Sequence, residues 1–503
     1  MARFEGIKST PKIEIKDKEV LSLVYTPGVG SSCLKIKENN EMASVLTNRL
    51  NSIAVISFSY EESLQRAIFL KSILLIDAYP LCIKECEQKD LKFVVENIEP
   101  NFCGIDLSLI KDFAKHVVFD VNIPVLTEPV NDIKEFFGTI ARNVFMFNPD
   151  NLKGDVSEKS LQLHELAGGV VETELTEKPG KKMVAVISDG TAVLGFGNIG
   201  ADAALPVMEG KCALYASLAD VDTVSLCYKT QNPKEVIKIT QLLAGSFSGI
   251  HLEDICAPNC FEIENTLIDT LSIPVFHDDQ HGTAIIVTAA VLNALAVVKK
   301  ELEEVKIVIN GAGAAGSAVA RLLLFAGVKK LYMLDKDGAI YKERKQNDEN
   351  LENLAQYTNP TDEKGSLSEI IKNADIFIGL SKGGLLKQEM IKSMAHKPVV
   401  FALANPVPEI MPDEALKAGA YIVGTGRSDY PNQINNSLAF PGVFKGAIEA
   451  NIPKIDDRIK LACALALASI IEEDELSREK ILPNALDPRV VKKIVSTVLS
   501  VKI

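Results

Sequence analysis

Residues 305–326 read VKIVINGAGAAGSAVARLLLFA, and this stretch decides the fold of the C-terminal half. The apolar run Val305–Asn310 has the length of a buried strand, and Ser317–Ala326 has the composition of a helix. Between them lies a GxGxxG turn, in which the first glycine permits a tight turn and the second lets the backbone approach a pyrophosphate. The third glycine lets helix and strand pack closely, and the N–H groups that begin the helix attract phosphate. We therefore expect a dinucleotide to bind at Gly311, Gly313, Ala314, Ala315 and Gly316.

A carboxylate follows at the distance that such a site requires. Asp335 stands at the end of the next apolar run, where an acidic side chain accepts hydrogen bonds from the adenosine ribose hydroxyls. A carboxylate there would repel a 2′-phosphate, so Asp335 favours NAD over NADP. The neighbouring Lys336 could soften this repulsion, which leaves NADP as the alternative.

Apolar runs alternate with helical or loop segments throughout the C-terminal half. This alternation predicts an α/β fold with a Rossmann-type, doubly wound parallel sheet. From about Phe444 onward the chain reads as helices, among them Arg458–Glu473. The uncharged run Gly282–Val298 is shorter than the ~20 residues of a membrane span, so we expect a buried helix. The runs expected as strands are residues 305–309, 330–334, 376–378, 399–403 and 421–423.

Length and composition restrict the function. A chain of 503 residues is too long for one core, so two or three domains are expected. Its net charge of −13 argues against a nucleic acid or an anionic membrane as the main partner. The nine cysteines are irregularly spaced and the N-terminus has no apolar core, so we expect free thiols and a cytoplasmic protein. Cys256 and Cys260 alone make a poor zinc site.

The first half of the chain contains a duplication. Ser52–Ser57 (SIAVIS) resembles residues 184–188 (VAVIS), and a longer set of matches follows at a constant offset of 145 positions, as between Ser72 and Ser217. After one small slip, residues 123–125 align with residues 273–275. The period is too long for a solenoid. We interpret it as one α/β module copied in tandem, with residues 58–180 as an inserted, degenerate copy. The matched pairs are Ser72, Asp77, Leu81, Cys82, Lys84, Gly104, Ile105 and Leu107 with Ser217, Asp222, Leu226, Cys227, Lys229, Gly249, Ile250 and Leu252.

The two copies differ where chemistry would lie. The glycine-rich stretch 190–200 has no counterpart in the first copy. The first copy keeps the apolar pattern and lacks the polar residues of the second copy. Comparison of the two copies therefore distinguishes residues that build the fold of the module from residues with a chemical role. Lys211, Glu253, Asp254 and Asp279 correspond to Arg66, Ser108, Leu109 and Pro129.

The polar set includes two acidic pairs at the ends of apolar strands. Glu253 and Asp254 end IHLED, and Asp278 and Asp279 end VFHDD. Such charges are costly unless they are neutralised, and a hard divalent cation such as Mg²⁺ or Mn²⁺ neutralises them through oxygen ligands. Nearby histidines (277 and 281) would suit zinc, but the excess of carboxylates favours the harder metals. The alternative is that these acids lie in solvated loops.

Lys211 lies in PVMEGKCALY, directly before an apolar run. It is either an ordinary surface lysine or, if it is buried near a metal, a general base.

A set of motifs, in this order, resembles the small-form malic enzymes. It covers the chain except for residues 58–180. The motifs are YTPGVG (25–30), SDGTAVLGFGNIG (188–200), PVMEGK (206–211), LEDICAPNCFEIE (252–264), FHDDQHGTA (276–284), INGAGAAG (309–316), ANP (404–406) and NNSLAFPG (435–442).

The resemblance implies oxidative decarboxylation of L-malate to pyruvate and CO₂ with reduction of NAD(P). It implies that Lys211 accepts the C2 hydroxyl proton, that Tyr25 protonates C3 and that Asp278 supports the lysine. A metal on Glu253, Asp254 and Asp279 would bind malate and polarise its C2 oxygen. Substrate carboxylate would be held by Asn405 and Asn436, the former also near the cofactor.

The sequence departs from the family in two places. Larger members have a substrate-binding arginine where this chain has Ala192, and the inserted copy separates Tyr25 from Ser188 by roughly 160 residues. The site must therefore combine parts of both modules or of two subunits, so a monomer and a homodimer are both open.

The alternative functions are those of another small-acid dehydrogenase and of a non-catalytic regulatory homologue. The expected segments are residues 1–57, the inserted module 58–180, the catalytic module 181–282, the NAD(P) domain 283–443 and C-terminal helices 444–503.

Overall fold

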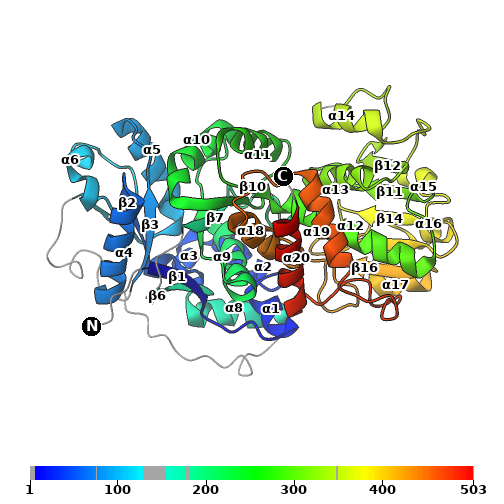
Figure 1. Cartoon of the computed structure of the whole chain (residues 1–503), viewed down its shortest axis with the longest axis horizontal. Helices are drawn as coiled ribbons and strands as arrows, with labels where there is room; N and C mark the ends of the chain where they lie inside the picture. Colours follow the sequence, from blue (N-terminus) through cyan, green and yellow to red (C-terminus); the bar gives the residue numbers. More distant parts are fainter. Residues whose placement is uncertain (1–5, 75, 128–154, 177–181, 347–348, 502–503) are drawn as a thin grey trace. The chain divides into compact units, whose positions relative to one another are not determined.

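The computed structural model describes residues 6–74, 76–127, 155–176, 182–346 and 349–501 (Figure 1). These residues form two compact units. The first comprises residues 1–255 and 262–275, and the second comprises residues 256–261 and 276–503. The five segments expected from the sequence stay a prediction, and Glu128 and Pro129, which the repeat aligns with Asp278 and Asp279, lie outside the described residues.

The second unit is built on a six-stranded sheet in the order β13-β12-β11-β14-β15-β16. All neighbours are parallel except the short β13, which pairs antiparallel with β12. The chain leaves the central strand β11 toward β12 and then crosses to β14, so the direction of winding switches between β11 and β14. This is the predicted doubly wound sheet, and its switch point is where such sheets bind ligands. The strands are β11 (Lys306–Asn310), β12 (Lys330–Asp335), β13 (Gly338–Ala339), β14 (Ile376–Gly379), β15 (Val399–Ala402) and β16 (Ile422–Thr425).

The helices of this unit follow the expected pattern with two differences. The predicted helix 282–298 begins earlier, at Asp278, and the predicted helix 458–473 ends at Ala468. The early end has an electrostatic reason, because Glu472, Glu473 and Asp474 would place negative charge at the negative end of a longer helix. The helices are α12 (Asp278–Val298), α13 (Ala314–Phe325), α14 (Glu349–Tyr357), α15 (Leu367–Ile370), α16 (Gln388–Lys392), α17 (Pro412–Lys417), α18 (Phe440–Glu449), α19 (Asp457–Ala468) and α20 (Pro488–Ser500).

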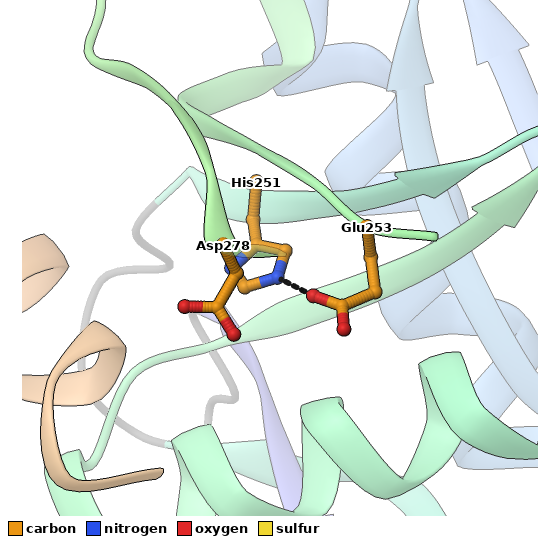
Figure 2. A group of neighbouring side chains, drawn as sticks. All are labelled: His251, Glu253 and Asp278. Carbon is orange, nitrogen blue, oxygen red and sulfur yellow. Dashed lines mark hydrogen bonds and ion pairs between the residues drawn. The ribbon is translucent and has the colours of Figure 1, made fainter. Parts of the chain in front are cut away.

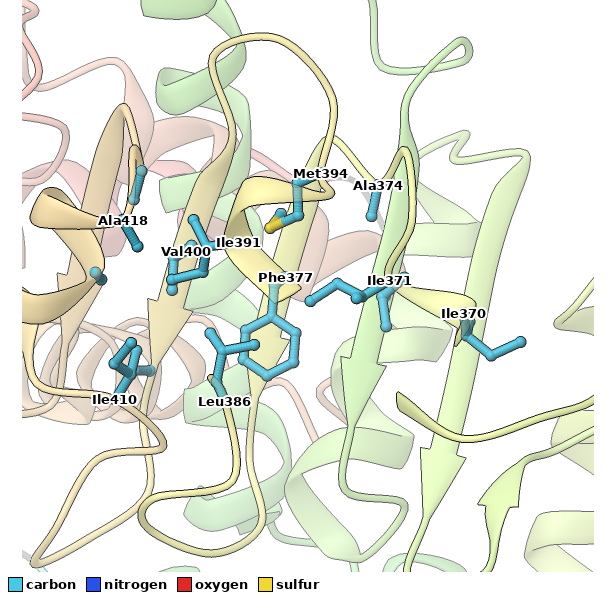
Figure 3. Close-up of a cluster of buried hydrophobic side chains, with 14 of the residues drawn as sticks. Ile370, Ile371, Ala374, Phe377, Leu386, Ile391, Met394, Val400, Ile410 and Ala418 are labelled. Carbon is cyan, nitrogen blue, oxygen red and sulfur yellow. The ribbon is translucent and has the colours of Figure 1, made fainter. Parts of the chain in front are cut away.

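One hydrophobic core covers a face of this sheet (Figure 3). Phe377 on β14 and Val400 on β15 belong to one cluster with Ile391 of α16 and Met394 just after it. Strands that are buried on both faces read as continuous apolar runs, which is why their positions were predictable. Helix α12 is apolar enough to cross a membrane by length and composition, but 72% of its most apolar window is buried inside the protein, as expected of a core helix.

The strands of the first unit, with β10 continuing two residues into the second, form two four-stranded sheets and a two-stranded ribbon. The sheet orders are β3-β2-β4-β5 and β8-β7-β9-β10, and the neighbouring strands whose pairing is described are parallel. Strands β1 and β6 pair antiparallel. The strands are β1 (Gly6–Pro11), β2 (Ser52–Ser57), β3 (Asp77–Cys82), β4 (Gly104–Asp106), β5 (Val125–Leu126), β6 (Val171–Thr176), β7 (Met183–Ser188), β8 (Thr223–Cys227), β9 (Phe247–Leu252) and β10 (Val275–His277).

Helices connect these strands in the same order in both sheets, α4 and α5 in the one and α9 and α10 in the other. Helix α9 carries Lys211 and is buried along most of its length, because small and apolar residues surround its axis. The helices are α1 (Lys18–Val24), α2 (Gly30–Glu38), α3 (Ala43–Leu46), α4 (Tyr60–Leu74), α5 (Gln88–Ile98), α6 (Lys111–Ala114), α8 (Val156–Ala167), α9 (Gly200–Ala219), α10 (Pro233–Leu243) and α11 (Asn259–Thr270).

Candidate active site

The two acidic pairs follow two neighbouring strands of one sheet. Strand β9 ends at Leu252 and leads into Glu253 and Asp254, and its neighbour β10 ends at His277 and leads into Asp278 and Asp279. The second pair was expected at a strand end, and it follows β10 directly as the first turn of α12. Carboxylates are favoured there by the positive end of the helix dipole.

The carboxyl ends of β9 and β10 bring together two overlapping groups of potential metal ligands. One oxygen from each of Glu253, Asp254 and Asp279 lies within 4.8 Å of the other two. The same holds for ligand atoms of His251, Glu253 and Asp278, which face one another in Figure 2. Glu253 and Asp254 are only 3% and 4% exposed, which argues against solvated loop acids. Buried like charges require a counter-charge, and oxygen donors fit Mg²⁺ or Mn²⁺.

The backbone of this cluster is strained at one residue. Asp254 has φ +55°, in the left-handed region that non-glycine residues rarely adopt. Its carbonyl accepts a hydrogen bond from the N–H of Ala192 at 2.9 Å. Ala192 therefore lies against the acidic cluster.

His251 was missed as a site residue, although it is fully buried beside Glu253. Its Nε2 lies 2.7 Å from Oε2 of Glu253, and its Nδ1 lies 2.9 Å from the hydroxyl of Tyr215. The ring therefore bridges a carboxylate and a phenol, an arrangement that fixes the orientation of a metal ligand. Two-residue spacing on a strand places His251 and Glu253 on the same face, and this was the available signal in the sequence.

Lys211 is a buried cation, and the surface alternative is wrong. Its side chain is 0% exposed, and its Nζ lies 3.0 Å from Oε2 of Glu253. The ring of Tyr25, at the end of α1, lies with its centroid 5.2 Å from the same nitrogen. A Cβ at Gly210 would stand 2.5 Å from the carbonyl oxygen of Val24 and 3.3 Å from the Tyr25 ring. Only glycine at this position lets α9 approach the Tyr25 segment so closely.

Asn436 and Asp278 form a second polar group. The amide of Asn436 donates to Oδ2 of Asp278 at 3.0 Å, and the hydroxyl of Thr283 donates to the amide oxygen of Asn436 at 3.2 Å. Asn436 is thus held in place by α12. The described contacts pair Asp278 with Asn436 and pair Lys211 with Glu253.

The glycine-rich turn has the geometry that a dinucleotide needs. Gly311 has φ +122°, and a Cβ there would lie 2.5 Å from the carbonyl oxygen of Leu380, just after β14. A Cβ at Gly316 would lie 1.8 Å from the carbonyl oxygen of Gly311, so strand and helix touch there. At Gly313 a Cβ would meet nothing within 4 Å, and no side chain caps the start of α13. There is therefore room beside Gly313, and no side chain caps the start of the helix, where phosphate would bind.

Two further residues surround this turn. Asp335 ends β12 as expected, and Nη2 of Arg344 lies 2.5 Å from its carboxylate. Arg344 was missed, because only the fold brings residue 344 back to the end of β12. Asn405 follows β15 and is exposed, with its side-chain oxygen 3.3 Å from where a Cβ at Gly426 would stand.

Burial perturbs an ionisable group beside the lysine on α9. Desolvation raises the pKa of Glu209 from 4.5 to about 8, although the backbone N–H of Asn48 donates to its carboxylate at 2.6 Å. The described cysteines are all free thiols, as expected. Cys256 and Cys260 do not belong to either ligand group found among the described residues.

Comparison with known proteins points to one family. The family model "Malic enzyme, NAD binding domain" matches residues 280–502, and "Malic enzyme, N-terminal domain" matches residues 157–234. The chain is 50% identical to a NAD-dependent malic enzyme of Geobacillus stearothermophilus over 62% of this chain and 66% of that protein. It is 50% identical to a bifunctional malic/malolactic enzyme of Bacillus subtilis over 63% of this chain and 77% of that protein.

Two further similarities bear on cofactor and fold. An NADP-dependent malic enzyme of Escherichia coli is 44% identical over 63% of this chain, which spans 44% of that longer protein. The crystal structure of a NAD-dependent malic enzyme from Thermotoga maritima superposes with a TM-score of 0.62 at 48% identity, covering 63% of this chain and 84% of that chain.

Proposed function

This chain belongs to the malic enzyme family, and we propose that it oxidises and decarboxylates L-malate to pyruvate and CO₂ while reducing NAD(P). The observation that carries the proposal is the buried ion pair of Lys211 with Glu253, inside a group of three carboxylates at the ends of β9 and β10. A dinucleotide-binding domain alone would serve many dehydrogenases, whereas this group suits a chelating hydroxy acid and a divalent cation.

We assign Glu253, Asp254 and Asp279 as the ligands of Mg²⁺ or Mn²⁺. Their close spacing and the burial of the first two support this assignment. When bound, the metal supplies Lewis-acid stabilisation of the charge that develops on the C2 oxygen, and NAD(P) supplies the hydride acceptor. His251 and Tyr215 hold Glu253 in its orientation.

The proton transfers are assigned to Lys211 and Tyr25. Lys211 accepts the proton of the C2 hydroxyl, and Tyr25 donates a proton to C3 after CO₂ has left. Both side chains are buried and only 5.2 Å separate the lysine nitrogen from the tyrosine ring centroid, so the two groups can serve neighbouring carbons of a four-carbon acid. Asp278, Asn436 and Asn405 are assigned to positioning. Because Ala192 stands where the resemblance implies a substrate-binding arginine, we assign the substrate carboxylate to Asn405 and Asn436.

NAD is the proposed cofactor, because Asp335 ends β12 where the ribose hydroxyls would bind. Arg344 neutralises part of this carboxylate, and an arginine near this position accommodates a 2′-phosphate in NADP-binding sheets. NADP is therefore the second cofactor to assay.

We further propose that residues 58–180 are the inserted, degenerate copy of the catalytic module. The identical strand orders of the two sheets support it, with β2 (Ser52–Ser57) standing just before residue 58 at the position that β7 has in the other sheet. Matched hydrogen bonds inside the two sheets support it as well. Ile105 N–H donates to the carbonyl of Pro124 at 3.0 Å, and its counterpart Ile250 donates to that of Pro274 at 2.8 Å. A cytoplasmic location and the absence of a nucleic-acid or membrane partner stay predictions from the sequence.

The test is formation of reduced nicotinamide, pyruvate and CO₂ from L-malate with Mn²⁺ and either NAD or NADP. We expect equal amounts of the three products, loss of activity with a chelator, and loss in Asp279→Asn. Glu262→Gln, which removes an exposed carboxylate from α11, is the matched control and should keep full activity. Reduction of cofactor without CO₂ would indicate another small-acid dehydrogenase, and no turnover at all would indicate a regulatory homologue.

A further inference from the structure

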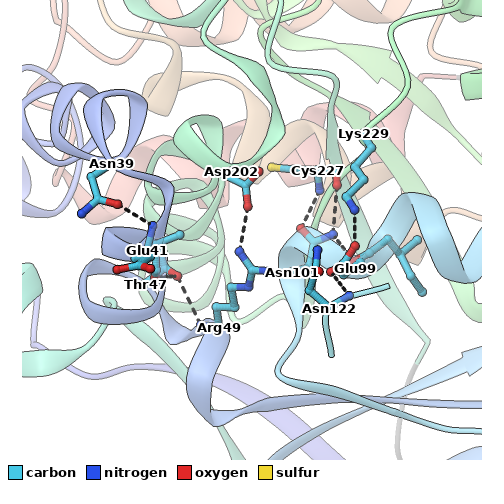
Figure 4. A network of polar contacts seen from close by, with 12 residues as sticks. Asn39, Glu41, Thr47, Arg49, Glu99, Asn101, Asn122, Asp202, Cys227 and Lys229 are labelled. Atoms are coloured by element: carbon cyan, nitrogen blue, oxygen red, sulfur yellow. Dashed lines mark hydrogen bonds and ion pairs between the residues drawn. The ribbon is translucent and has the colours of Figure 1, made fainter. Parts of the chain in front are cut away.

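The two sheets of the first unit contact each other through residues that occupy equivalent positions. The side chain of Asn101 accepts from the N–H of Cys227 at 2.7 Å and donates to its carbonyl at 3.0 Å (Figure 4). The hydroxyl of Ser246 accepts from the N–H of Cys82 at 2.6 Å and donates to its carbonyl at 3.1 Å. Cys227 and Ser246 stand 145 positions after Cys82 and Asn101. Each sheet therefore contributes residues at the same two positions to its contact with the other sheet.

Backbone contacts repeat the same reciprocity. The N–H of Lys84 donates to the carbonyl of Leu242 at 2.8 Å, and the N–H of Lys229 donates to the carbonyl of Asn97 at 3.1 Å. Lys229 and Leu242 are again the counterparts of Lys84 and Asn97 at the offset of 145. Exchanging the two copies exchanges these two hydrogen bonds.

The ribbon of β1 and β6 crosses between the copies. Ser9 and Thr173 face each other at its centre, with Ile7 opposite Leu175 and Pro11 opposite Val171, a register that maps onto itself when the strands are exchanged. The N–H of Ser9 donates to Asp222 at 2.7 Å, and the N–H of Thr173 donates to Asp77 at 3.0 Å. Asp77 and Asp222 are counterparts at the same offset. Strand β1 therefore binds the sheet of the second copy through Asp222, and β6 binds the sheet of the first copy through Asp77.

One position pairs with its own counterpart. The ammonium of Lys238 on α10 lies 5.7 Å from the ring centroid of Phe93 on α5, and these two residues are separated by the same 145 positions. Contact of a position with itself, together with reciprocal pairs, defines an isologous interface around a two-fold axis. Unrelated faces of two modules would give no such reciprocity.

From this reciprocity we infer that the first copy takes the place of a second subunit, so that one chain contains a complete two-fold pair of catalytic modules. The inference rests on the proposed function for its catalytic consequence. The occupant of the two-fold face is residues 58–127 of the same chain, together with the N-terminal segment that precedes them.

The two halves of this internal pair have different roles. Tyr25 precedes β2, in the part of the chain that belongs to the first copy, whereas Lys211 lies in the second. In the first copy Arg66 and Asp106 occupy the positions of Lys211 and His251 and form an ion pair at 2.8 Å, with Asp106 fully buried. The first copy thus contributes Tyr25 to the site of the second copy. In the first copy itself, the Arg66–Asp106 ion pair occupies the equivalent positions, which gives one site per chain.

Zero-length cross-linking tests the arrangement in the intact protein. Lys238 and Asp90 form an ion pair across the two-fold face, and a carbodiimide joins such a pair by an amide bond with loss of water. We expect the joined product to run at the single-chain mass of 54.6 kDa and its peptide map to link these two residues. A product of twice that mass carrying this link, or a map without it, would overturn the inference. Lys238→Arg keeps the positive charge but presents a guanidinium, and it should lose the link.

Co-expression tests the catalytic consequence. Tyr25→Phe and Lys211→Ala are each expected to be inactive, and together they should remain inactive, because both residues act within one chain. Recovery of turnover in the mixture would show a site shared between chains, and full activity of Tyr25→Phe alone would refute the role of the first copy. An inactive wild-type enzyme would refute the proposed function, while the cross-link would still decide the internal pairing.

Discussion

Removing the hydroxyl of Tyr215 should weaken metal binding without disturbing the fold. Tyr215→Phe deletes a 2.9 Å hydrogen bond to His251 and keeps the ring, which packs edge-on against the imidazole at a centroid distance of 5.7 Å. Leaving a buried imidazole nitrogen without this partner costs about 1–3 kcal/mol. Loss of a group that orients a metal ligand weakens metal affinity about 10–100-fold. Ten-fold corresponds to about 1.4 kcal/mol, so the two magnitudes agree.

The assay is titration of the protein with Mn²⁺, in which free Mn²⁺ is followed by electron paramagnetic resonance in the absence of substrate. Turnover measured at saturating and at limiting Mn²⁺ should show that most of the loss is recovered at high metal. Tyr228→Phe is the matched control, because this buried tyrosine loses only a 3.5 Å contact with Thr240. Unchanged Mn²⁺ affinity in Tyr215→Phe, or an equal loss in the control, would refute the role proposed for the hydrogen bonds that link Tyr215 through His251 to Glu253.

Three further changes test other parts of the site. Gly210→Ala should lower turnover at least ten-fold and lower the melting temperature, although alanine favours helices, because its Cβ would displace the Tyr25 segment; wild-type kinetics would contradict this. Burial raises the pKa of Glu209 from 4.5 to about 8, so between these pH values the folded state binds more protons than the unfolded state. The free energy of unfolding should therefore fall as the pH rises through this range, by at most about 1.4 kcal/mol per pH unit. Denaturant titrations of Glu209→Gln should lack this fall, and equal slopes would exclude Glu209 as its source. Arg344→Gln, which removes the cation beside Asp335, should raise the KM for NADP more than the KM for NAD; equal changes would place Arg344 outside the cofactor site.

Local patterns explain why the second unit was predictable. A buried parallel strand must be apolar throughout, and a GxGxxG turn must be glycine where Gly311 and Gly316 approach other backbone atoms. The short β13 was missed, because two residues carry no periodicity. The acidic cluster was found because Glu253 and Asp279 adjoin apolar strands.

Contacts that depend on register and tertiary packing were not readable from the sequence. Tyr215 meets His251 only because α9 packs beside β9, and the burial of Lys211 depends on what surrounds α9. The sequence also suggested a duplicated module but left its partner open. The reciprocal contacts of Asn101 and Ser246 required both sheets to be placed within one unit.

The number of Mn²⁺ ions bound per chain tests the central claim most directly. The account predicts one ion per 54.6 kDa chain by equilibrium binding, and its loss in Asp279→Asn. Two ions per chain would mean that the first copy retains a working metal site. Undiminished binding in Asp279→Asn would contradict the assignment of the cluster at the ends of β9 and β10.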